Sequence, residues 1–256
     1  MTISVSYRFD NSVILVTGAG SGIGAALARH CAGEGAIVVA VDRRHDLLLA
    51  QVDEPARSRI DLRQVDVSDE KAVAALITDL PRKYPRLDAA VLGAAVQYRT
   101  DIDKMSPREW REVIDVNLNG VFYCLRGIIP MLKSQRSGAI VVFTSGLALT
   151  GWPGASAYAA SKAALIGMIK SAAHELKAFN VRANVLSPGV RATPIFLGVS
   201  TELEREQYRQ SIGIGEPEGV VPTLLYLISD ASANLTGVVI EHRISPSGEA
   251  AGTTPC

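Results

Sequence analysis

The sequence predicts an α/β fold in which helices cover both faces of one doubly wound parallel sheet. Apolar strand-like runs alternate with helical segments along the chain, and several runs are apolar throughout rather than at every second residue. Continuous apolar runs are typical of parallel strands buried on both faces. Regular alternation of strand and helix is typical of a doubly wound sheet. The expected strands are 13–17, 36–41, 60–65, 89–92, 139–144, 181–186 and 238–244.

Helical patterns fill the intervals between these strands. No linker rich in Pro, Gly or Ser, no charge block and no internal repeat divides the 256 residues, so we expect a single domain, 1–256. The expected helices lie near 22–34, 44–52, 68–84, 106–134, 156–179 and 216–230.

The composition excludes several classes of function. The chain is 48% hydrophobic and 20% charged, with a formal net charge of +0, so it lacks the basic excess that nucleic-acid binding usually needs. We see no signal peptide and no apolar run near the roughly 18 residues of a membrane span. Three distant cysteines and four histidines lack metal-ligand spacing. We therefore expect a cytoplasmic protein without a metal, nucleic-acid or membrane partner.

A glycine-rich turn, TGAGSGIG, follows the first expected strand. It places Gly18, Gly22 and Gly24 before a helical segment, with Ser21 and Ile23 beside the last two glycines. Glycines allow a ligand to approach the backbone closely, and a helix that begins there offers free N–H groups and a positive dipole end. The turn therefore favours a phosphate or pyrophosphate site, although a glycine turn without a ligand is the alternative.

Acidic residues end the second and third expected strands. Asp42 lies 18 residues after Gly24 and would accept hydrogen bonds from an adenosine ribose, so it favours NAD over NADP. Arg43 and Arg44 follow at once and would attract a 2′-phosphate, unless they are solvated surface charges. Asp66 would accept from an adenine amino group, and Asp66 or Ser68 would cap the next helix; the two roles are compatible.

Tyr158 and Lys162 lie four residues apart on one expected helix, so they share a face. An ammonium near a phenol lowers the pKa of the tyrosine, which would then exchange a proton with a substrate hydroxyl. Ser145, at the end of the fifth expected strand, would hydrogen-bond the same oxygen. The alternative is an ordinary surface pair, since this spacing is common on exposed helices.

Taken together, residues 9 to 240 resemble the short-chain dehydrogenase/reductase family, whose fold is Rossmann-like. The motifs that carry the resemblance, in order, are TGAGSGIG at 17–24, Asp66-Val67, Asn117 in VNLNG, Ser145, Tyr158-x-x-x-Lys162, and Ser187-Pro188-Gly189 followed by Thr193. The resemblance implies that Tyr158 is the acid/base, and that Lys162 lowers its pKa and holds the nicotinamide ribose. It also implies that Ser145 orients the substrate and that Asn117 holds a relay water.

The residue patterns and the resemblance together give the expected cofactor contacts. These are Gly18, Ser21, Gly22, Ile23, Gly24, Asp42, Arg43, Asp66, Val67, Gly93, Tyr158, Lys162, Pro188, Gly189, Val190 and Thr193.

Two places depart from the family pattern. The usual Asn-Asn-Ala-Gly is replaced at 92–95 by LGAA, which removes side-chain hydrogen bonds at the central sheet. The usual Asp-Gly-Gly after the last strand is replaced near 243–248, which puts tail-mediated subunit contacts in doubt.

The leading hypothesis is an NAD(H)-dependent oxidoreductase acting on a secondary alcohol or ketone. One alternative is an NADP(H)-dependent ketone or 3-oxoacyl reductase, and another is a nucleotide-binding regulatory protein without turnover. The family resemblance implies a homotetramer, although the altered tail leaves a dimer possible. Apolar residues on two long helices support an interface, unless they belong to the core: Leu118, Val121, Phe122, Leu125, Leu165, Ile166 and Ile169.

The loops after the strands predict a mainly apolar substrate pocket under a mobile lid at about 191–213. The expected substrate contacts are Ser145, Gln97, Leu147, Trp152, Tyr158 and Phe196, with Gln97 as the orienting polar group. The alternative for Phe196 is a core residue that anchors the loop. Such a pocket would favour neutral secondary alcohols, whereas a preference for carboxylates would indicate Arg191 as an anion clamp.

Overall fold

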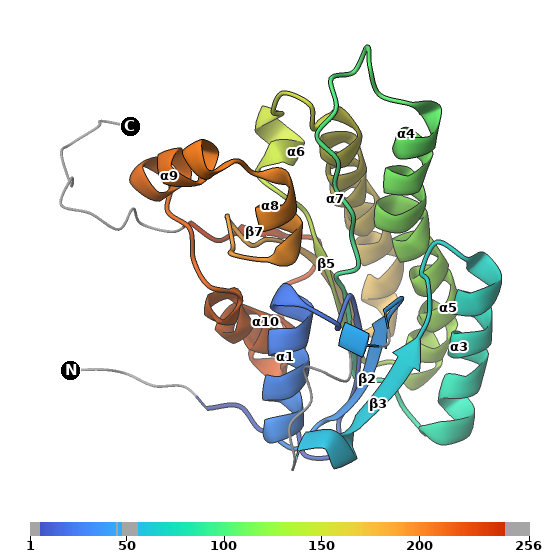
Figure 1. Cartoon of the computed structure of the whole chain (residues 1–256). Helices are drawn as coiled ribbons and strands as arrows, with labels where there is room; N and C mark the ends of the chain where they lie inside the picture. The colour runs from blue at the N-terminus through green and yellow to red at the C-terminus, as the bar shows by residue number, and fades with distance from the viewer. Residues whose placement is uncertain (1–5, 45, 48–55, 244–256) are drawn as a thin grey trace, which may run out of the picture.

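The computed structural model describes residues 6–44, 46–47 and 56–243, which form one seven-stranded sheet with helices on both faces (Figure 1). The strands are β1 Val13–Thr17, β2 Ile37–Asp42, β3 Ile60–Gln64, β4 Ala89–Leu92, β5 Gly138–Phe143, β6 Val181–Ser187 and β7 Val239–Glu241. Their order across the sheet is β3-β2-β1-β4-β5-β6-β7, and every neighbouring pair is parallel. The predicted fold class is confirmed.

The helices follow the strands in alternation. They are α1 Gly22–Gly33, α3 Glu70–Lys83, α4 Pro107–Ile114, α5 Gly120–Gln135, α6 Leu147–Thr150, α7 Ser156–Leu176, α8 Pro194–Val199, α9 Glu202–Ser211 and α10 Val221–Ile228. The helix expected near 44–52 lies largely outside the described residues, as does the altered tail beyond Arg243. The single helix expected at 106–134 is wrong in detail, because a π-helical turn, Asp115–Asn119, separates α4 from α5.

Capping side chains fix where several helices begin. The Asp69 carboxylate accepts hydrogen bonds from the Lys71 and Ala72 amides at the start of α3, so the cap is Asp69 and not Asp66 or Ser68. Ser106 and Glu109 form a reciprocal capping box at α4. A capping box is the arrangement that satisfies two otherwise unpaired amides at a helix start.

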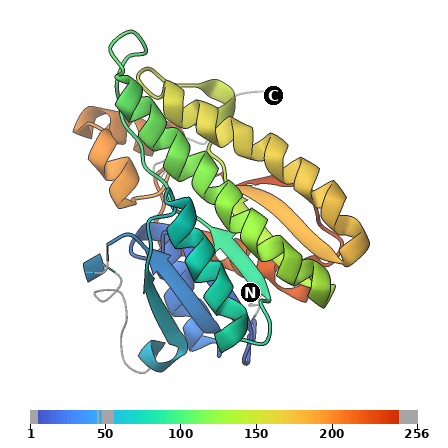
Figure 2. The same cartoon turned by 90° about the vertical axis from the view of Figure 1, so that its right-hand side faces the viewer.

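The core has two layers, one on each face of the sheet. Alternate strand residues point to opposite faces: Leu15 and Val39 belong to the layer beneath α3, α5 and α7, and Ile14 and Val38 to the layer beneath α1 and α10. Figure 2 shows α3, α5 and α7 side by side over the first face. This burial explains why the strands read as continuous apolar runs.

Candidate active site

The carboxyl ends of the strands meet around one cavity of about 1080 Å³. Gly18 follows β1, Asp42 ends β2, Gly93 follows β4, Ser145 follows β5 and Pro188 follows β6. Because the strand order reverses between β1 and β4, this is where a doubly wound sheet binds its ligands. Every site residue predicted from the sequence lines the cavity except Asn117, which lies behind it.

The glycine turn fits the pyrophosphate of a dinucleotide. Gly18 and Gly22 have φ of 72° and 55°, and a Cβ at Gly18 would lie 2.8 Å from the Ala94 amide nitrogen. Within the described start of α1, the Ser21 side chain caps no amide and the first turn holds no acidic residue. The positive end of the helix, with Ile23 and Gly24, is therefore left to the cavity.

Asp42 points back toward the glycine turn. Its Oδ2 accepts the Gly20 amide at 3.0 Å and its Oδ1 accepts the Arg44 amide at 3.1 Å. A negative charge at this place opposes a 2′-phosphate and suits ribose hydroxyls. Arg43 also lines the cavity, but its guanidinium lies 3.8 Å from the Glu112 carboxylate, which partly offsets its charge.

The segments after β3 and β4 form the adjoining part of the cavity wall. Asp66 and Val67 line the cavity, and the Asp66 carboxylate accepts the amide and the hydroxyl of Ser68. Thr17 compensates for part of the altered 92–95 motif, because its Oγ1 accepts the amides of Gly93 at 3.1 Å and Ala94 at 3.3 Å. The backbone there is therefore held by a strand side chain rather than by the asparagines of the family pattern.

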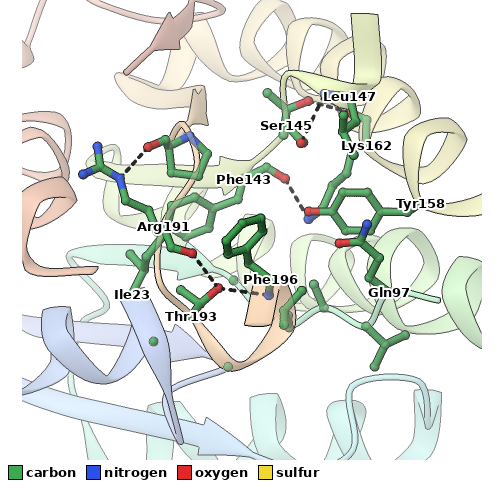
Figure 3. Close-up of a pocket in the computed structure, with 18 of the residues that line it drawn as sticks. Ile23, Gln97, Phe143, Ser145, Leu147, Tyr158, Lys162, Arg191, Thr193 and Phe196 are labelled. Carbon is green, nitrogen blue, oxygen red and sulfur yellow. Dashed lines mark hydrogen bonds between the residues drawn. The ribbon is translucent and has the colours of Figure 1, made fainter. Parts of the chain in front are cut away.

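Ser145, Tyr158 and Lys162 lie together at the opposite end of the cavity (Figure 3). The Lys162 ammonium donates to the Phe143 carbonyl at 2.9 Å and lies 5.7 Å from the centre of the Tyr158 ring. Thr144 fixes the base of this lysine, since its hydroxyl donates to the Lys162 carbonyl at 2.9 Å. The i, i+4 spacing on α7 thus brings both side chains to one face, as predicted.

Burial controls the charges of this group. It raises the pKa of Tyr158 to about 12, while a hydrogen bond with Ser145 and the charge of Arg99 act to lower it. Burial also lowers the pKa of Lys162 to about 8. The ammonium of Lys162 is itself desolvated and donates to the Phe143 carbonyl, and its predicted effect on the pKa of Tyr158 stays a prediction.

Asn117 sits in the π-helical turn and is fully buried. Its Oδ1 accepts the Val96 amide at 2.8 Å, and its Nδ2 donates to the Val96 carbonyl at 2.9 Å and to the Ser161 hydroxyl at 3.2 Å. The side chain therefore fixes the loop after β4 against α7. π-helical turns of this kind are frequent at functional sites.

The loop after β6 supplies the remaining predicted cofactor contacts. Pro188, Gly189, Val190 and Thr193 line the cavity, and the Thr193 hydroxyl accepts the Phe196 amide at 3.4 Å. The guanidinium of Arg191, the anion clamp considered from the sequence, is bonded within the protein. It extends away from Tyr158 in Figure 3. It donates from Nε to the Pro188 carbonyl at 2.7 Å.

The predicted substrate contacts surround the catalytic cluster. Gln97, Leu147, Trp152 and Phe196 all line the cavity, and Figure 3 shows Gln97 and Phe196 on the Tyr158 side. Phe196 is half-buried and packs edge-on against Tyr208, with ring centres 5.7 Å apart, so it is not an internal core residue.

The predicted lid segment contains two short helices, α8 and α9, which Arg205 ties together. Its Nη2 donates to the Leu197 and Ser200 carbonyls, each at 2.8 Å. Gly213, just beyond α9, has φ of 75°, a conformation that favours glycine. The segment is therefore braced internally and followed by a glycine that permits an unusual backbone turn.

Two residues that the sequence reasoning missed also line the cavity, Arg99 and Tyr208. The Arg99 guanidinium lies 5.8 Å from the centre of the Trp152 ring, and Tyr208 packs on the same indole with ring centres 5.6 Å apart. No sequence pattern marks either residue, because their partners lie about 50 to 110 positions away in the chain. They add aromatic and cationic groups to the cavity wall.

No helix among the described residues is long and apolar enough to cross a membrane. The same part of the chain holds no group of three His, Cys, Asp or Glu side chains arranged to bind a metal ion.

The doubly wound sheet, the strand-end cavity and the Ser-Tyr-Lys cluster define an NAD(P)-dependent oxidoreductase. A family model described as short chain dehydrogenase matches residues 12–204. The chain belongs to the short-chain dehydrogenase/reductase family, as its motifs predicted.

Individual relatives agree with this assignment. The chain is 36% identical to a 3-oxoacyl-(acyl-carrier-protein) reductase of Thermotoga maritima, over 91% of this chain and 96% of the relative. It is 33% identical to a 3beta-hydroxysteroid dehydrogenase of Mediterraneibacter gnavus, over 91% and 94%. Among solved structures, a Brucella melitensis 3-ketoacyl-(acyl-carrier-protein) reductase complexed with NADH has a TM-score of 0.84 at 26% identity, covering 91% and 97%.

Proposed function

We propose that this chain is an NAD(H)-dependent oxidoreductase that interconverts a secondary alcohol and a ketone. The observation that carries the proposal is the placement of Ser145, Tyr158 and Lys162 at one end of a cavity whose other end holds the glycine turn and Asp42. The two ends are where a dinucleotide and a small carbonyl compound would meet.

Each residue of the cluster has a separate role in the proposed reaction. When bound, the nicotinamide accepts or supplies the hydride. In reduction the Tyr158 hydroxyl gives its proton to the ketone oxygen and becomes the phenolate. In oxidation the Tyr158 phenolate takes the proton of the alcohol. The Ser145 hydroxyl orients the substrate oxygen in both directions. Lys162 holds the nicotinamide ribose. Asn117 keeps the loop after β4 in place through Val96. Its family role, which is to hold a water that links Lys162 to solvent, is part of the proposal.

Asp42 supports NAD as the cofactor, since its carboxylate lies beside the glycine turn and would repel a 2′-phosphate. The Brucella melitensis relative complexed with NADH is consistent with this choice. A 3-oxoacyl reductase using NADP(H) is the second candidate. The name of the Thermotoga maritima relative and the presence of Arg43 in the cavity wall favour it.

We further propose a single-domain, cytoplasmic enzyme with a lid at 191–213 that assembles as a homotetramer. Of the seven apolar residues that suggested an interface, Val121, Leu125, Leu165 and Ile169 are buried in the core and only Phe122 is exposed, at 46%. The tetramer therefore rests chiefly on family resemblance. Light scattering at micromolar concentration should give about four times 27.2 kDa, and a 27.2 kDa species alone would refute it.

The test of the function is an absorbance assay at the reduced-nicotinamide band, with NAD and a panel of secondary alcohols. Tyr158→Phe should lower kcat about 10²–10⁴-fold, because it deletes only the proton-transferring oxygen. The Kd for NAD should be retained. Tyr123→Phe, on α5 and outside the cavity lining, is the matched control. A normal rate in Tyr158→Phe would end the assignment, and tight NAD binding without turnover of any substrate would favour the regulatory alternative.

A further inference from the structure

Arg99 lines the cavity, and backbone contacts beside it fix its position. The Thr100 amide donates to the Gly154 carbonyl at 2.9 Å, which ties the loop after β4 to the loop before α7. Gly154 has φ of 71°, and a Cβ there would lie 3.3 Å from the Arg99 carbonyl carbon. The close approach of these two loops sets the position from which the Arg99 side chain reaches the cavity.

The guanidinium of Arg99 contacts neutral groups. Nη1 donates to the Pro153 carbonyl at 3.3 Å, the guanidinium lies over the Trp152 ring, and its charge acts to lower the pKa of Tyr208. Arg99 forms no ion pair with any residue that the structure describes. Its Nε is buried without a hydrogen-bond partner, and a buried N–H left in this way costs free energy.

The Glu204 carboxylate interacts with this charge, but it forms no ion pair with Arg99 in the described part of the chain. Its Oε2 accepts the Thr201 amide at 2.8 Å, and its Oε1 accepts the Trp152 indole N–H at 3.4 Å. Both oxygens are therefore occupied in capping α9 and holding the indole. The Arg99 charge also acts on the reaction centre. It helps to lower the pKa of Tyr158, which burial raises.

The other arginine that the sequence offered is already satisfied. Arg191 donates to the Pro188 carbonyl through Nε, to the Glu216 carbonyl through Nη1 and to His242 through Nη2. Arg99 differs from it in one respect: its buried Nε has no hydrogen-bond partner among the described residues, whereas the Nε of Arg191 donates at 2.7 Å. A planar guanidinium stacked on an aromatic ring is a common arrangement for binding a carboxylate through two parallel hydrogen bonds.

We propose that the substrate carries a carboxylate, which Arg99 binds while the hydroxyl or keto carbon lies at Ser145 and Tyr158. This inference rests on the proposed function and reverses the expectation that neutral alcohols are preferred. On binding, the guanidinium turns into the cavity and gives up its long bond to the Pro153 carbonyl. The carboxylate then satisfies Nε. Trp152 and Tyr208 remain as the apolar wall beside the substrate chain.

The kinetic test compares hydroxy acids of four to eight carbons with their methyl esters. The wild type should prefer the acid over its ester in kcat/KM by about 10- to 100-fold, the range expected for a hydrogen bond to a charged group. Arg99→Met, which keeps an apolar stem, should abolish this ratio, and Arg99→Lys should restore part of it. Arg126→Met, on an exposed ion pair with Glu70, is the control and should keep it.

A second measurement does not need turnover. Cyclohexanecarboxylate, added to the NADH complex, should change the fluorescence of Trp152 saturably, whereas its methyl ester should not. Arg99→Met should remove the response, with Trp152→Phe identifying the signal. Saturable carboxylate binding without any oxidation would reject the proposed function but retain the anion site. Equal rates for acids and esters, or an unchanged ratio in Arg99→Met, would overturn the role of Arg99.

Discussion

Arg191 and His242 are joined by a hydrogen bond of 2.6 Å between Nη2 and Nδ1. A guanidinium can only donate, so Nδ1 accepts and the neutral imidazole carries its proton on Nε2, which lies 2.6 Å from the Thr223 hydroxyl. This connection links the loop after β6, the end of β7 and α10. It holds the base of the predicted lid.

The first prediction concerns acid sensitivity. Burial, followed by the charge of Arg191, lowers the pKa of His242 below its ordinary 6.5, so the unfolded chain takes up this proton more readily. The stabilisation is therefore complete above about pH 6.5 and is lost as the pH falls through the folded-state pKa. His242→Gln should flatten the dependence of Tm on pH in this window, while His30→Gln, at an exposed site, should not. An unchanged slope in His242→Gln would contradict the assignment.

The second prediction concerns cofactor choice. Asp42→Asn keeps an acceptor for the Gly20 amide but removes the charge, so the ratio of Kd values for NADP and NAD should fall at least about tenfold. Asp42→Ala should shift it in the same direction. Titration of both cofactors gives the ratio. Tighter binding of NADP by the wild type, or an unchanged ratio in both variants, would show that Asp42 does not set the preference.

The third prediction is that Lys162 lowers the stability of the cofactor-free protein although turnover needs it. Burial lowers its pKa to about 8 from 10.5, so the free protein should gain stability as pH rises from 8 towards 10.5, where the unfolded chain binds more protons. Lys162→Met should remove that rise, increase Tm of the cofactor-free protein at pH 7 and abolish turnover. Thermal unfolding across pH measures this. A lower Tm at pH 7 would mean that the Phe143 hydrogen bond outweighs the desolvation.

The fourth prediction is that the two asparagines of the π-helical turn, Asn117 and Asn119, contribute differently to the free energy of unfolding. Asn117→Ala leaves both polar groups of the Val96 backbone without their partner, so the free energy of unfolding should fall by about 2 to 4 kcal/mol. Asn119→Ala, which loses only a local bond to Asp115, should change it by less than about 1 kcal/mol. Denaturant titration measures both, and equal losses would mean that the Val96 contacts carry little energy.

The parts of this molecule that depend on local pattern were predictable from sequence. The strands could be located because residues such as Leu15 and Val39 are apolar without alternation, and the turn at Gly18 was evident because glycine has few substitutes there. The extra residue before α5 could not be seen, since π and α turns share the same residue preferences. The charge at Arg99 escaped notice because its significance lies in the partners that it lacks, and only folding decides which partners are in reach.

The π-helical turn also limits which changes in chain length this region accepts. Gly120 donates its amide to the carbonyl of Asp115, five residues earlier rather than four, so the segment holds one residue more than a regular helix. Deleting a single residue here would restore the regular ladder but rotate all that follows by about 100°. Val121 and Leu125 of α5 would then turn away from the sheet against which they pack, and residues that are now exposed would face it. Substitutions can be absorbed along these helices, whereas a one-residue change in length cannot.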